Sequence, residues 1–448
     1  MSGRYKAYPE YKNSGVTWMG EIPTDWSEVR FKHVLADKKK TLRPDLPAGS
    51  ISFGRVVYKD ADILSNETKA AYQEVLSGEF LVNPLNLNYD LMSLRTALSS
   101  IDVVVSTGYI VLQSNGRLHP NYTRWLLQQF DVAHMKTLGA GVRQTINYAD
   151  IGNSFFFEPT IPEQTQIAAF LDHETAKIDR LIEKQQALIS LLKEKRQAVI
   201  SHAVTKGLNP HAPLKDSGIE WLGQVPAHWV ILALGKITLA RCDGPFGSGL
   251  KSEHYTESGV RVIRLQNIKM GIYHEGDGAF IDKNYYARNL SNHDVVAGDL
   301  LIAGLGDPNN PVGRACVAPN DIAPAMVKAD CFRFRLDPRK AVPGFIAQQL
   351  SNSAAVDSGE LSSGSTRARI PLSLMASRTV LVCPLDEQRA ILDYIARISK
   401  KYDRLESLAA VAVSFLQERR TALISAAVTG KIDVRHWQPS ASLISENK

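Results

Sequence analysis

The sequence contains few cysteines and no long apolar run. Four cysteines occur in 448 residues, and none forms a Cys-x-x-Cys pair or has a histidine at ligand-like spacing. We therefore expect neither a disulfide framework nor a structural zinc site. No apolar run approaches the roughly 18 residues needed to cross a bilayer, and the first residues lack the apolar core of a signal peptide. These absences predict a cytoplasmic protein that does not enter a membrane.

The motifs of common catalytic sites are also missing. The sequence has no Gly-x-x-x-x-Gly-Lys-Ser/Thr phosphate loop, no Gly-x-Ser-x-Gly elbow and no His-Glu-x-x-His pair. Gly139-Ala140-Gly141 is too short for the cofactor loop of a methyltransferase. Asn309-Asn310-Pro311-Val312 lacks the second proline and the aromatic residue of an amino-methyltransferase box, and is typical of a turn. We expect no catalytic residue, no metal site and no cofactor bound by this chain.

Glycine and proline are absent from residues 163–206 and again from 385–429. Proline costs about 3 kcal/mol in a helix interior, so both stretches are predicted to be long helices. The two stretches also repeat each other without a gap. Glu163-Gln164 recurs as Glu387-Gln388, and Asp179-Arg180-Leu181 recurs as Asp403-Arg404-Leu405, each 224 positions later.

The spacing of mostly apolar positions in both helices predicts a coiled-coil seam. The seam positions from Ile178 to His202 step alternately by three and four residues, a 3.5-residue period that places one stripe along a helix. Gln185, Lys195 and Arg419 interrupt this seam with polar groups. About 40 residues would span on the order of 60 Å, enough for a spacer. The alternative, that each helix covers only its own domain, stays open. The residues predicted to pack are Ile178, Leu181, Leu188, Leu192, Val199, Tyr402, Leu405, Leu416 and Leu423.

A second, shorter repeat precedes each of two dissimilar blocks. Trp18 and Trp26, with the glycines and proline between them, recur 203 positions later as Trp221 and Trp229. These connectors are rich in turn residues, and their tryptophans suit either the core or a contact with a partner. The blocks that follow, 27–162 and 230–384, mix short apolar runs with turn residues, which predicts mixed, strand-rich domains. Lysine plus arginine nearly balances aspartate plus glutamate in both, so bulk charge says little about nucleic acid.

Loop segments in both blocks suit contacts with nucleic acid. Residues 241–251 place glycines between basic ends, and residues 139–146 and 363–370 each place arginine after a run of small residues. An ordinary solvated loop is the alternative in each case. Lys38-Lys39-Lys40 is predicted to be a solvated face rather than a contact. The predicted DNA-binding residues are Arg143, Gln144, Thr145, Arg241, Ser248, Lys251, Arg367 and Arg369.

Over nearly its full length, this architecture resembles the specificity subunit of type I restriction-modification systems. The resemblance is carried by Ser217-Gly218-Ile219-Glu220-Trp221-Leu222-Gly223 with Pro226 and Trp229, by Pro384-x-x-Glu387-Gln388, by Asp403-Arg404-Leu405 and by Ala427-Val428-Thr429-Gly430-Lys431-Ile432-Asp433. The first half departs slightly, because Glu163 directly follows Pro162 and Lys206-Gly207 inverts Gly430-Lys431.

The resemblance implies an α+β fold with an internal pseudo-two-fold repeat. Two mixed α/β target-recognition domains would be joined by two long antiparallel coiled-coil helices, and each domain would read half of a split site in double-stranded DNA. Two methyltransferase (modification) subunits would dock on the helices and methylate adenine, and restriction motor-nuclease subunits would join them. S-adenosylmethionine, ATP and Mg²⁺ are expected on those partners, and the chain itself is expected not to be an enzyme.

The expected organisation has seven segments: connector 1–26, target-recognition domain 27–162, helix 163–206, connector 207–229, target-recognition domain 230–384, helix 385–429 and tail 430–448. Two other classes remain open. A coiled-coil adaptor that binds only protein would fail to bind DNA even with methyltransferase subunits present, and an enzyme in its own right would transfer methyl groups alone. The sequence leaves the recognised bases undetermined.

Overall fold

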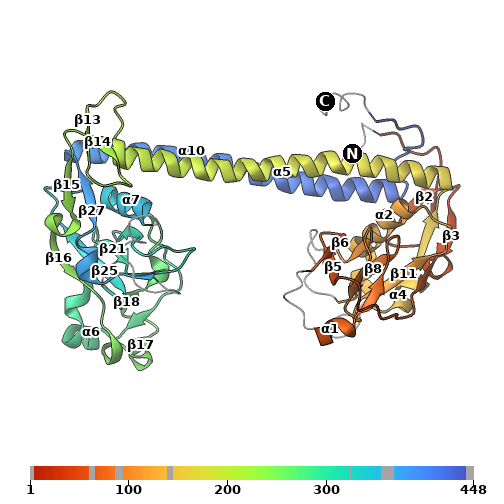
Figure 1. The fold of residues 1–448 in the computed structure, drawn as a ribbon, viewed down its shortest axis with the longest axis horizontal. Coiled ribbons are helices and arrows are strands. Elements are labelled where there is room, and N and C mark those ends of the chain that lie inside the picture. The colour runs from red at the N-terminus through yellow and green to blue at the C-terminus, as the bar shows by residue number, and fades with distance from the viewer. Residues whose placement is uncertain are drawn as a thin grey trace. The chain divides into compact units, whose positions relative to one another are not determined.

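The computed structural model describes residues 5–59, 66–85, 94–138, 145–322, 324–354 and 368–439. The chain divides into two compact units, which we call unit 1 (residues 1–187 and 409–448) and unit 2 (residues 188–408). Both units mix helices with short strands, which confirms the predicted α+β class (Figure 1). A search of the described helices found none with the length and apolar character of a membrane span.

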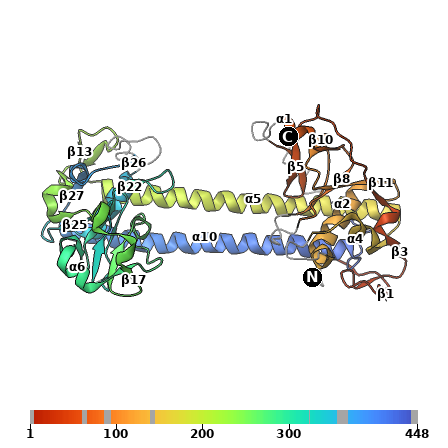
Figure 2. The same ribbon diagram turned by 90° about the horizontal axis from the view of Figure 1, so that it is seen from below.

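Unit 1 is organised around a four-stranded antiparallel sheet. Its central strand β8 is short and wholly buried, as expected for a strand covered on both faces. The strand order is β4 (Leu35–Asp37), β11 (Ile110–Ser114), β8 (Phe80–Val82) and β9 (Thr96–Leu98). Figure 2 labels the two central strands, β11 and β8. The two-stranded pairs are β1 (Tyr11–Asn13) with β2 (Glu21–Pro23), β3 (Ser27–Arg30) with β12 (Phe155–Glu158), β5 (Gly49–Ser52) with β6 (Arg55–Tyr58), and β7 (Gln73–Val75) with β10 (Val103–Val105).

Two helices of unit 1 contact this sheet: α2 (Pro120–Phe130) contacts β9, and α4 (Tyr148–Asn153) contacts β4. Pro120 stands in the first turn of α2, where its missing N–H costs no hydrogen bond, and Tyr122, Leu126 and Phe130 are fully buried. Residues 118–136, with Trp125-Leu126-Leu127 among them, have the pattern of one helix, whereas the structure has a π-helix at Asp131–Met135. The helices of the recognition block are α1 (Asn66–Ala70), α2 (Pro120–Phe130), α3 (Lys136–Leu138) and α4 (Tyr148–Asn153), with a 3-10 turn η1 (Phe31–His33).

Unit 2 contains two larger sheets. The antiparallel four-stranded sheet has the order β16 (Thr238–Cys242), β25 (Cys331–Leu336), β21 (Leu300–Ala303), β23 (Ala315–Val317). The mixed five-stranded sheet has the order β17 (Tyr255–Thr256), β19 (Phe280–Ile281), β18 (Val260–Ile263), β24 (Ala325–Val327), β20 (Asp294–Val295). The apolar runs 260–265, 299–303 and 331–336 predict strands, and these sheets contain them as β18, β21 and β25, within two residues at each end.

The rest of unit 2 consists of strand pairs, helices and short turns. The pairs are β13 (Leu214–Asp216) with β14 (Gln224–Pro226), β15 (Val230–Ala233) with β27 (Thr379–Val382), and β22 (Leu305–Gly306) with β26 (Ala368–Arg369). The helices are α6 (Lys283–Asn289), α7 (Pro343–Ser353) and α9 (Leu372–Met375). The 3-10 turns are η4 (Leu234–Ile237), η5 (Gly247–Gly249), η6 (Ser252–His254), η7 (Leu265–Asn267) and η8 (Ser291–His293).

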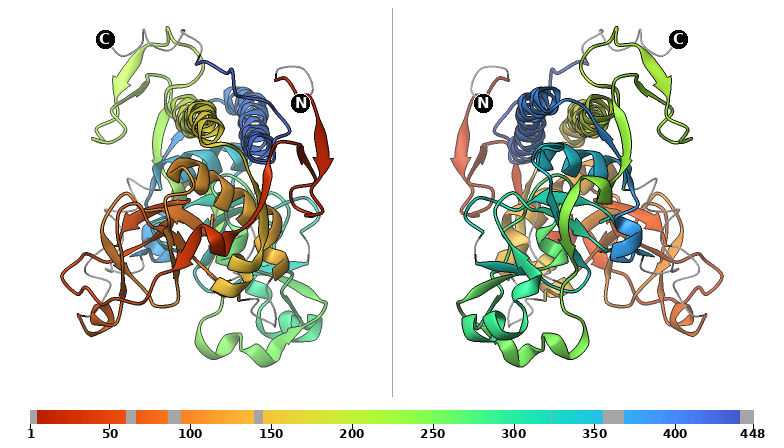
Figure 3. Two further views of the ribbon diagram at one scale, coloured as in Figure 1. Left: turned by 90° about the vertical axis from the view of Figure 1, so that its right-hand side faces the viewer. Right: turned by 90° about the vertical axis from the view of Figure 1, so that its left-hand side faces the viewer.

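Two long helices, α5 (Ile161–Lys206) and α10 (Leu385–Val428), contribute to both units. Their bounds lie within two residues of those predicted. In unit 1 the start of α5 lies beside the end of α10, so the helices run in opposite directions there (Figure 3). An ion pair joins Arg420 Nε to Asp179 Oδ1 at 2.8 Å. The equivalent pair in unit 2 joins Arg196 Nη1 to Asp403 Oδ1 at 2.6 Å.

The positions of the predicted seam differ in burial. Leu181, Leu188 and Leu405 were predicted to pack, but their exposed fractions are 47%, 41% and 38%. The next residues, Ile182 and Ile189, are half-buried instead. A helix turns by about 100° per residue, so the two members of an apolar pair lie on different faces of the helix. Ile178 and Leu423 are buried, and Leu192, Val199, Tyr402 and Leu416 are half-buried.

Each long helix begins with a carboxylate that holds a connector tryptophan. Glu163 accepts hydrogen bonds from Trp26 Nε1 at 3.1 Å and from the Tyr8 hydroxyl at 2.5 Å. Glu387 accepts from Trp229 Nε1, also at 3.1 Å. Negative charge is favourable in the first turn of a helix, where backbone N–H groups lack partners. The repeated glutamate and tryptophan are therefore parts of one contact.

Three of the four connector tryptophans serve the core. Trp18, Trp26 and Trp229 are buried, whereas Trp221 is half-buried and lines a cavity of about 440 Å³ in unit 2. Each connector thus contributes at least one buried tryptophan to the hydrophobic core of its unit. The sequence left open whether these tryptophans belong to the core or contact a partner, and Trp18, Trp26 and Trp229 belong to the core.

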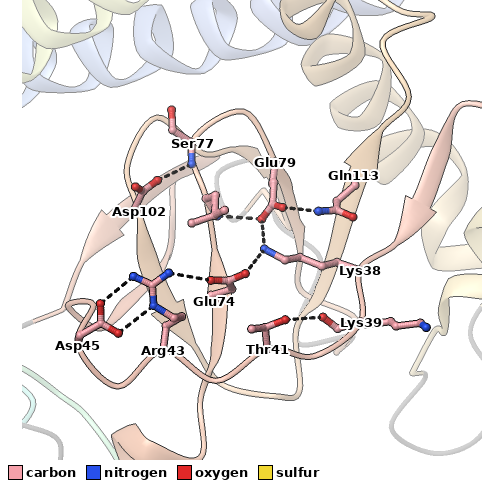
Figure 4. Close-up of polar contacts among 11 residues, drawn as sticks. Lys38, Lys39, Thr41, Arg43, Asp45, Glu74, Ser77, Glu79, Asp102 and Gln113 are labelled. Atoms are coloured by element: carbon pink, nitrogen blue, oxygen red, sulfur yellow. Dashed lines mark hydrogen bonds and ion pairs between the residues drawn. The ribbon is translucent and has the colours of Figure 1, made fainter.

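The lysine run in unit 1 is not uniformly solvated. Lys38 follows β4, and its side chain is only 8% exposed. Its Nζ atom lies 3.0 Å from Glu74 Oε1 and 2.9 Å from Glu79 Oε2 (Figure 4). The prediction of a solvated face is wrong for Lys38, because two carboxylates meet it inside the domain, while Lys39 and Lys40 are exposed.

Candidate nucleic-acid interface

The glycine-rich segment after β16 is held by its own chain. Asp243 Oδ1 accepts hydrogen bonds from the N–H of Gly244 at 2.7 Å and of Asp330 at 3.0 Å. A Cβ atom on Gly244 would lie 2.0 Å from the carbonyl carbon of Lys328. Glycines in a loop allow backbone to approach a ligand closely. At Gly244 the close approach is instead to backbone of the same unit, which only glycine permits.

Two of the segments predicted to contact nucleic acid meet in unit 2. Phe246 belongs to the glycine-rich segment, and Arg369 belongs to β26 at the end of the other. The Arg369 guanidinium carbon lies 5.2 Å from the centre of the Phe246 ring, and Arg369 Nε donates to Asp330 Oδ1 at 2.8 Å. Phe246 is 50% exposed. An aromatic ring, a guanidinium and a carboxylate therefore share one solvent-facing cluster, which we call the Phe246–Asp330–Arg369 cluster.

The carboxyl of Asp243 contacts this cluster through the N–H of Asp330, and its pKa is raised. Burial raises its pKa to about 6, and the nearby charge of Asp330 acts in the same direction. Hydrogen bonds from backbone N–H groups and the positive charge of Arg369 act against the shift. Asp243 is thus ionised at neutral pH but titrates closer to neutrality than an ordinary aspartate.

The remaining predicted contacts are spread over both units. Arg241 and Lys251 are exposed at the two ends of the glycine-rich segment. Thr145 is exposed in unit 1 and forms an isolated bridge with Leu85. Arg143, Gln144 and Arg367 lie outside the described residues, as does the side chain of Ser248. The assignment of all these residues to DNA contacts stays a prediction.

Sequence reasoning missed two members of the cluster. Phe246 lies inside a predicted segment, but the prediction rested on the glycines and the basic ends of that segment. Asp330 is 39 positions from Arg369 and carried no sequence motif. Its backbone φ of +62° is one of two positive values among described non-glycine residues. Such strain is visible only in a structure, and it is concentrated at sites that need a fixed geometry.

The long helices expose large apolar side chains, which makes each a candidate surface for a protein partner. In unit 1, Leu181 of α5 and Phe415 of α10 are 47% and 64% exposed. In unit 2 the exposed set comprises Leu188, Leu191, Leu405 and Leu408. Leucines predicted to join the two helices are thus left available to other chains.

No protein-family model matches the chain. It is 21% identical over 426 residues to the type I restriction enzyme MjaVIII specificity subunit of Methanocaldococcus jannaschii, covering 93% of this chain and 95% of that protein. A chain from a solved structure on complex assembly and conformational transition of the type I R-M system matches with a TM-score of 0.65 and 13% identity, covering 91% and 98% of the two chains. The HsdS subunit from Thermoanaerobacter tengcongensis aligns over 92% and 98% with a TM-score of 0.49 and 14% identity. The chain thus resembles a type I specificity subunit in sequence along nearly its whole length, and its fold resembles that of a chain from a type I R-M system.

Proposed function

We propose that this chain, which resembles type I specificity subunits from end to end, is the non-catalytic DNA-recognition subunit of a type I restriction-modification complex. The observation that carries the proposal is the repeated scaffold around two unlike domains. Equivalent Glu–Trp contacts, Arg–Asp pairs and four-stranded antiparallel sheets occur in both units. Beyond these shared parts, the described residues of unit 2 add a mixed five-stranded sheet, whereas those of unit 1 add two-stranded pairs. A duplicated scaffold with dissimilar inserts suits a DNA site whose two halves have different sequences.

Each recognition block would read one half-site. The first block, residues 27–162, and the second, residues 230–384, would make sequence-dependent contacts through their loops. Among the candidate contacts that the structure describes, Arg241, Lys251 and Arg369 are exposed. The helices between the blocks would fix the number of base pairs that separate the half-sites.

The exposed apolar side chains of α5 and α10 would receive two methyltransferase subunits. Apolar helix faces pack well against partner helices, and Leu408 and Phe415 are 57% and 64% exposed without a partner chain. Those subunits would bind S-adenosylmethionine and methylate adenine, which requires that the target base leave the helical stack. Motor-nuclease subunits with ATP and Mg²⁺ would complete the restriction complex. This chain would position its partners and perform no chemistry.

Methylation-sensitive sequencing of host genomes tests the function directly. Genomes with and without a functional gene for this chain should differ by one bipartite adenine-methylated motif with a fixed gap. The purified chain with S-adenosylmethionine and unmethylated DNA should transfer no methyl groups. Unchanged methylation after gene deletion, or methyl transfer by the chain alone, would contradict the proposal. Assembly with methyltransferase subunits without any DNA binding would identify a protein-binding adaptor.

A further inference from the structure

Backbone hydrogen bonds fix the position of Arg369 in unit 2. It lies in β26, where its backbone pairs with Leu305 of β22, so the strand ladder fixes the origin of the side chain. The ladder is short, and the next residue, Ile370, is fully buried and donates its N–H to the Gly304 carbonyl at 3.0 Å. The position of Arg369 is therefore set by the core of unit 2 and not by a free loop.

The guanidinium is then fixed by two different contacts. Arg369 Nε donates to Asp330 Oδ1 at 2.8 Å, and the guanidinium carbon lies 5.2 Å from the Phe246 ring centre. Asp330 is itself immobilised, since its N–H bonds to Asp243 and its carbonyl accepts from the N–H of Gly304 at 2.8 Å. An arginine that is ordered before binding loses less conformational entropy when it meets a ligand.

These contacts leave the outer edge of the guanidinium available. Asp330 occupies Nε, and no described residue accepts a hydrogen bond from either Nη atom of Arg369. The side chain is 51% exposed. Two parallel N–H groups therefore face solvent in the fork geometry that matches a pair of adjacent acceptors.

The surrounding charge decides between the two nucleic-acid groups that offer such a pair. A phosphate is negatively charged and would meet the carboxylates of Asp330 and Asp243 beside the guanidinium. The O6 and N7 atoms of guanine are neutral acceptors in the major groove, where arginine is their commonest partner. The exposed ring of Phe246 also suits the apolar edge of a base better than a phosphate.

We propose that Arg369 reads a guanine in the half-site bound by unit 2, with Asp330 and Phe246 positioning its guanidinium. This assignment rests on the proposed function as a DNA-recognition subunit. Arg369 makes the base contact, and its two neighbours act only through it. The recognised half-site thus contains at least one guanine whose N7 and O6 are both required.

The test combines protein variants with base analogues in the assembled complex. The full-length chain with its methyltransferase subunits is bound to duplexes that carry the methylated motif, and each guanine is replaced in turn by 7-deazaguanine. One replacement in a single half-site should weaken binding of the wild-type complex. Arg369→Ala should weaken binding of the unmodified motif by about 5- to 150-fold and should be insensitive to that same replacement.

Two further variants separate guanine from phosphate and from loss of folding. Arg369→Lys keeps the positive charge but lacks the planar fork, so it should lose discrimination as Arg369→Ala does. Arg339→Ala removes an 84% exposed arginine that is paired with Asp337 in the same unit, and it should bind like the wild type. Retained affinity in Arg369→Lys, with loss in Arg369→Ala equal on all sequences, would identify a phosphate contact and overturn the inference.

The outcomes also separate this inference from the function on which it rests. Specific binding in which no guanine of the motif is sensitive to 7-deaza replacement would overturn the guanine assignment alone, whatever the variants do. A wild-type complex that does not prefer its methylated motif would overturn both. A single sensitive guanine whose effect disappears in Arg369→Ala supports the assignment.

Discussion

Replacing Glu163 by alanine removes one acceptor that two buried donors share. Trp26 and Tyr8 are 1% and 6% exposed, so neither donor can turn to water after the change. Burial, with the adjacent carboxylate, raises the pKa of Tyr8, and the phenol therefore remains a donor at neutral pH. Each buried donor left without a partner costs about 1–3 kcal/mol, so the two together cost about 2–6 kcal/mol. The lost charge at the helix N-terminus adds about 0.3–1 kcal/mol.

The repeat supplies a matched comparison within the same molecule. Glu387 accepts from Trp229, which is fully buried, but its other partner is His228, whose side chain is 48% exposed and can bond to water. Glu387→Ala should therefore leave a single buried donor and cost about 1–3 kcal/mol. Glu163→Gln keeps an acceptor oxygen of similar size and should cost about 1 kcal/mol, mainly the lost charge.

Hydrogen exchange of α5 and α10, measured alongside guanidinium unfolding, reports the two units separately. Glu163→Ala should lower protection in unit 1 by more than Glu387→Ala lowers it in unit 2, and Glu163→Gln should lie close to the wild type. Equal losses at the two positions, or a glutamine variant as unstable as the alanine variant, would refute the reasoning from unpaired donors.

Four further predictions concern recognition and pH. Four residues inserted after Leu188 lengthen α5 by about 6 Å, so the gap between the half-sites of the methylated motif should grow by one or two base pairs. Two inserted residues instead turn the packed face of the helix by roughly 200° and should prevent assembly. An unchanged gap in an assembled four-residue variant would contradict a spacer role. Exchanging residues 27–160 for the first block of another specificity subunit should change one half of the motif, and a change in both halves would argue against separable domains. Arg143→Ala or Arg367→Ala should weaken specific binding by about 1–3 kcal/mol if the arginine reads a base; a phosphate contact should instead give an equal loss on all sequences and a salt slope lower by about one. The pKa of Asp243 is raised to about 6 in the folded protein, so its contribution to the free energy of unfolding is full below about pH 4 and is lost as pH rises through 6. Asp243→Asn should therefore flatten the decline of that free energy with pH, measured by denaturant titration of unit 2.

The long helices were predictable because two independent signals coincide. Glycine and proline are absent over each stretch, and the same residues recur in both copies. The packed face was less predictable. Leu181-Ile182 and Leu188-Ile189 are both apolar pairs, so periodicity alone does not say which member faces the partner helix. The structure half-buries the isoleucines and exposes the leucines, which a hydrophobic scale does not foresee.

The candidate interface was predictable in its segments but not in its geometry. The sequence identified Arg369 and the glycine-rich segment separately. Their contact depends on Asp330, which is far from both in sequence and reaches Arg369 through the fold of β22 and β26. Lys38 shows the same limit, since a run of three lysines suggests solvent but tertiary packing supplies Glu74 and Glu79 as partners. Local chemistry is readable from sequence, whereas long-range pairing is not.

Unit 1 is built from two segments at opposite ends of the chain, so it cannot be completed on the ribosome until the second segment has been made. Gln129 donates to Ser425, and the two residues are 296 positions apart. At about 5–20 residues per second, Ser425 is made roughly 15–60 s after Gln129. During that interval the buried face of α5 in unit 1 has no α10 to cover it, whereas unit 2 is one continuous segment that can fold as it emerges. The first domain to be translated is thus the last to be completed, and nascent chains should depend on chaperones until the C-terminal helix arrives.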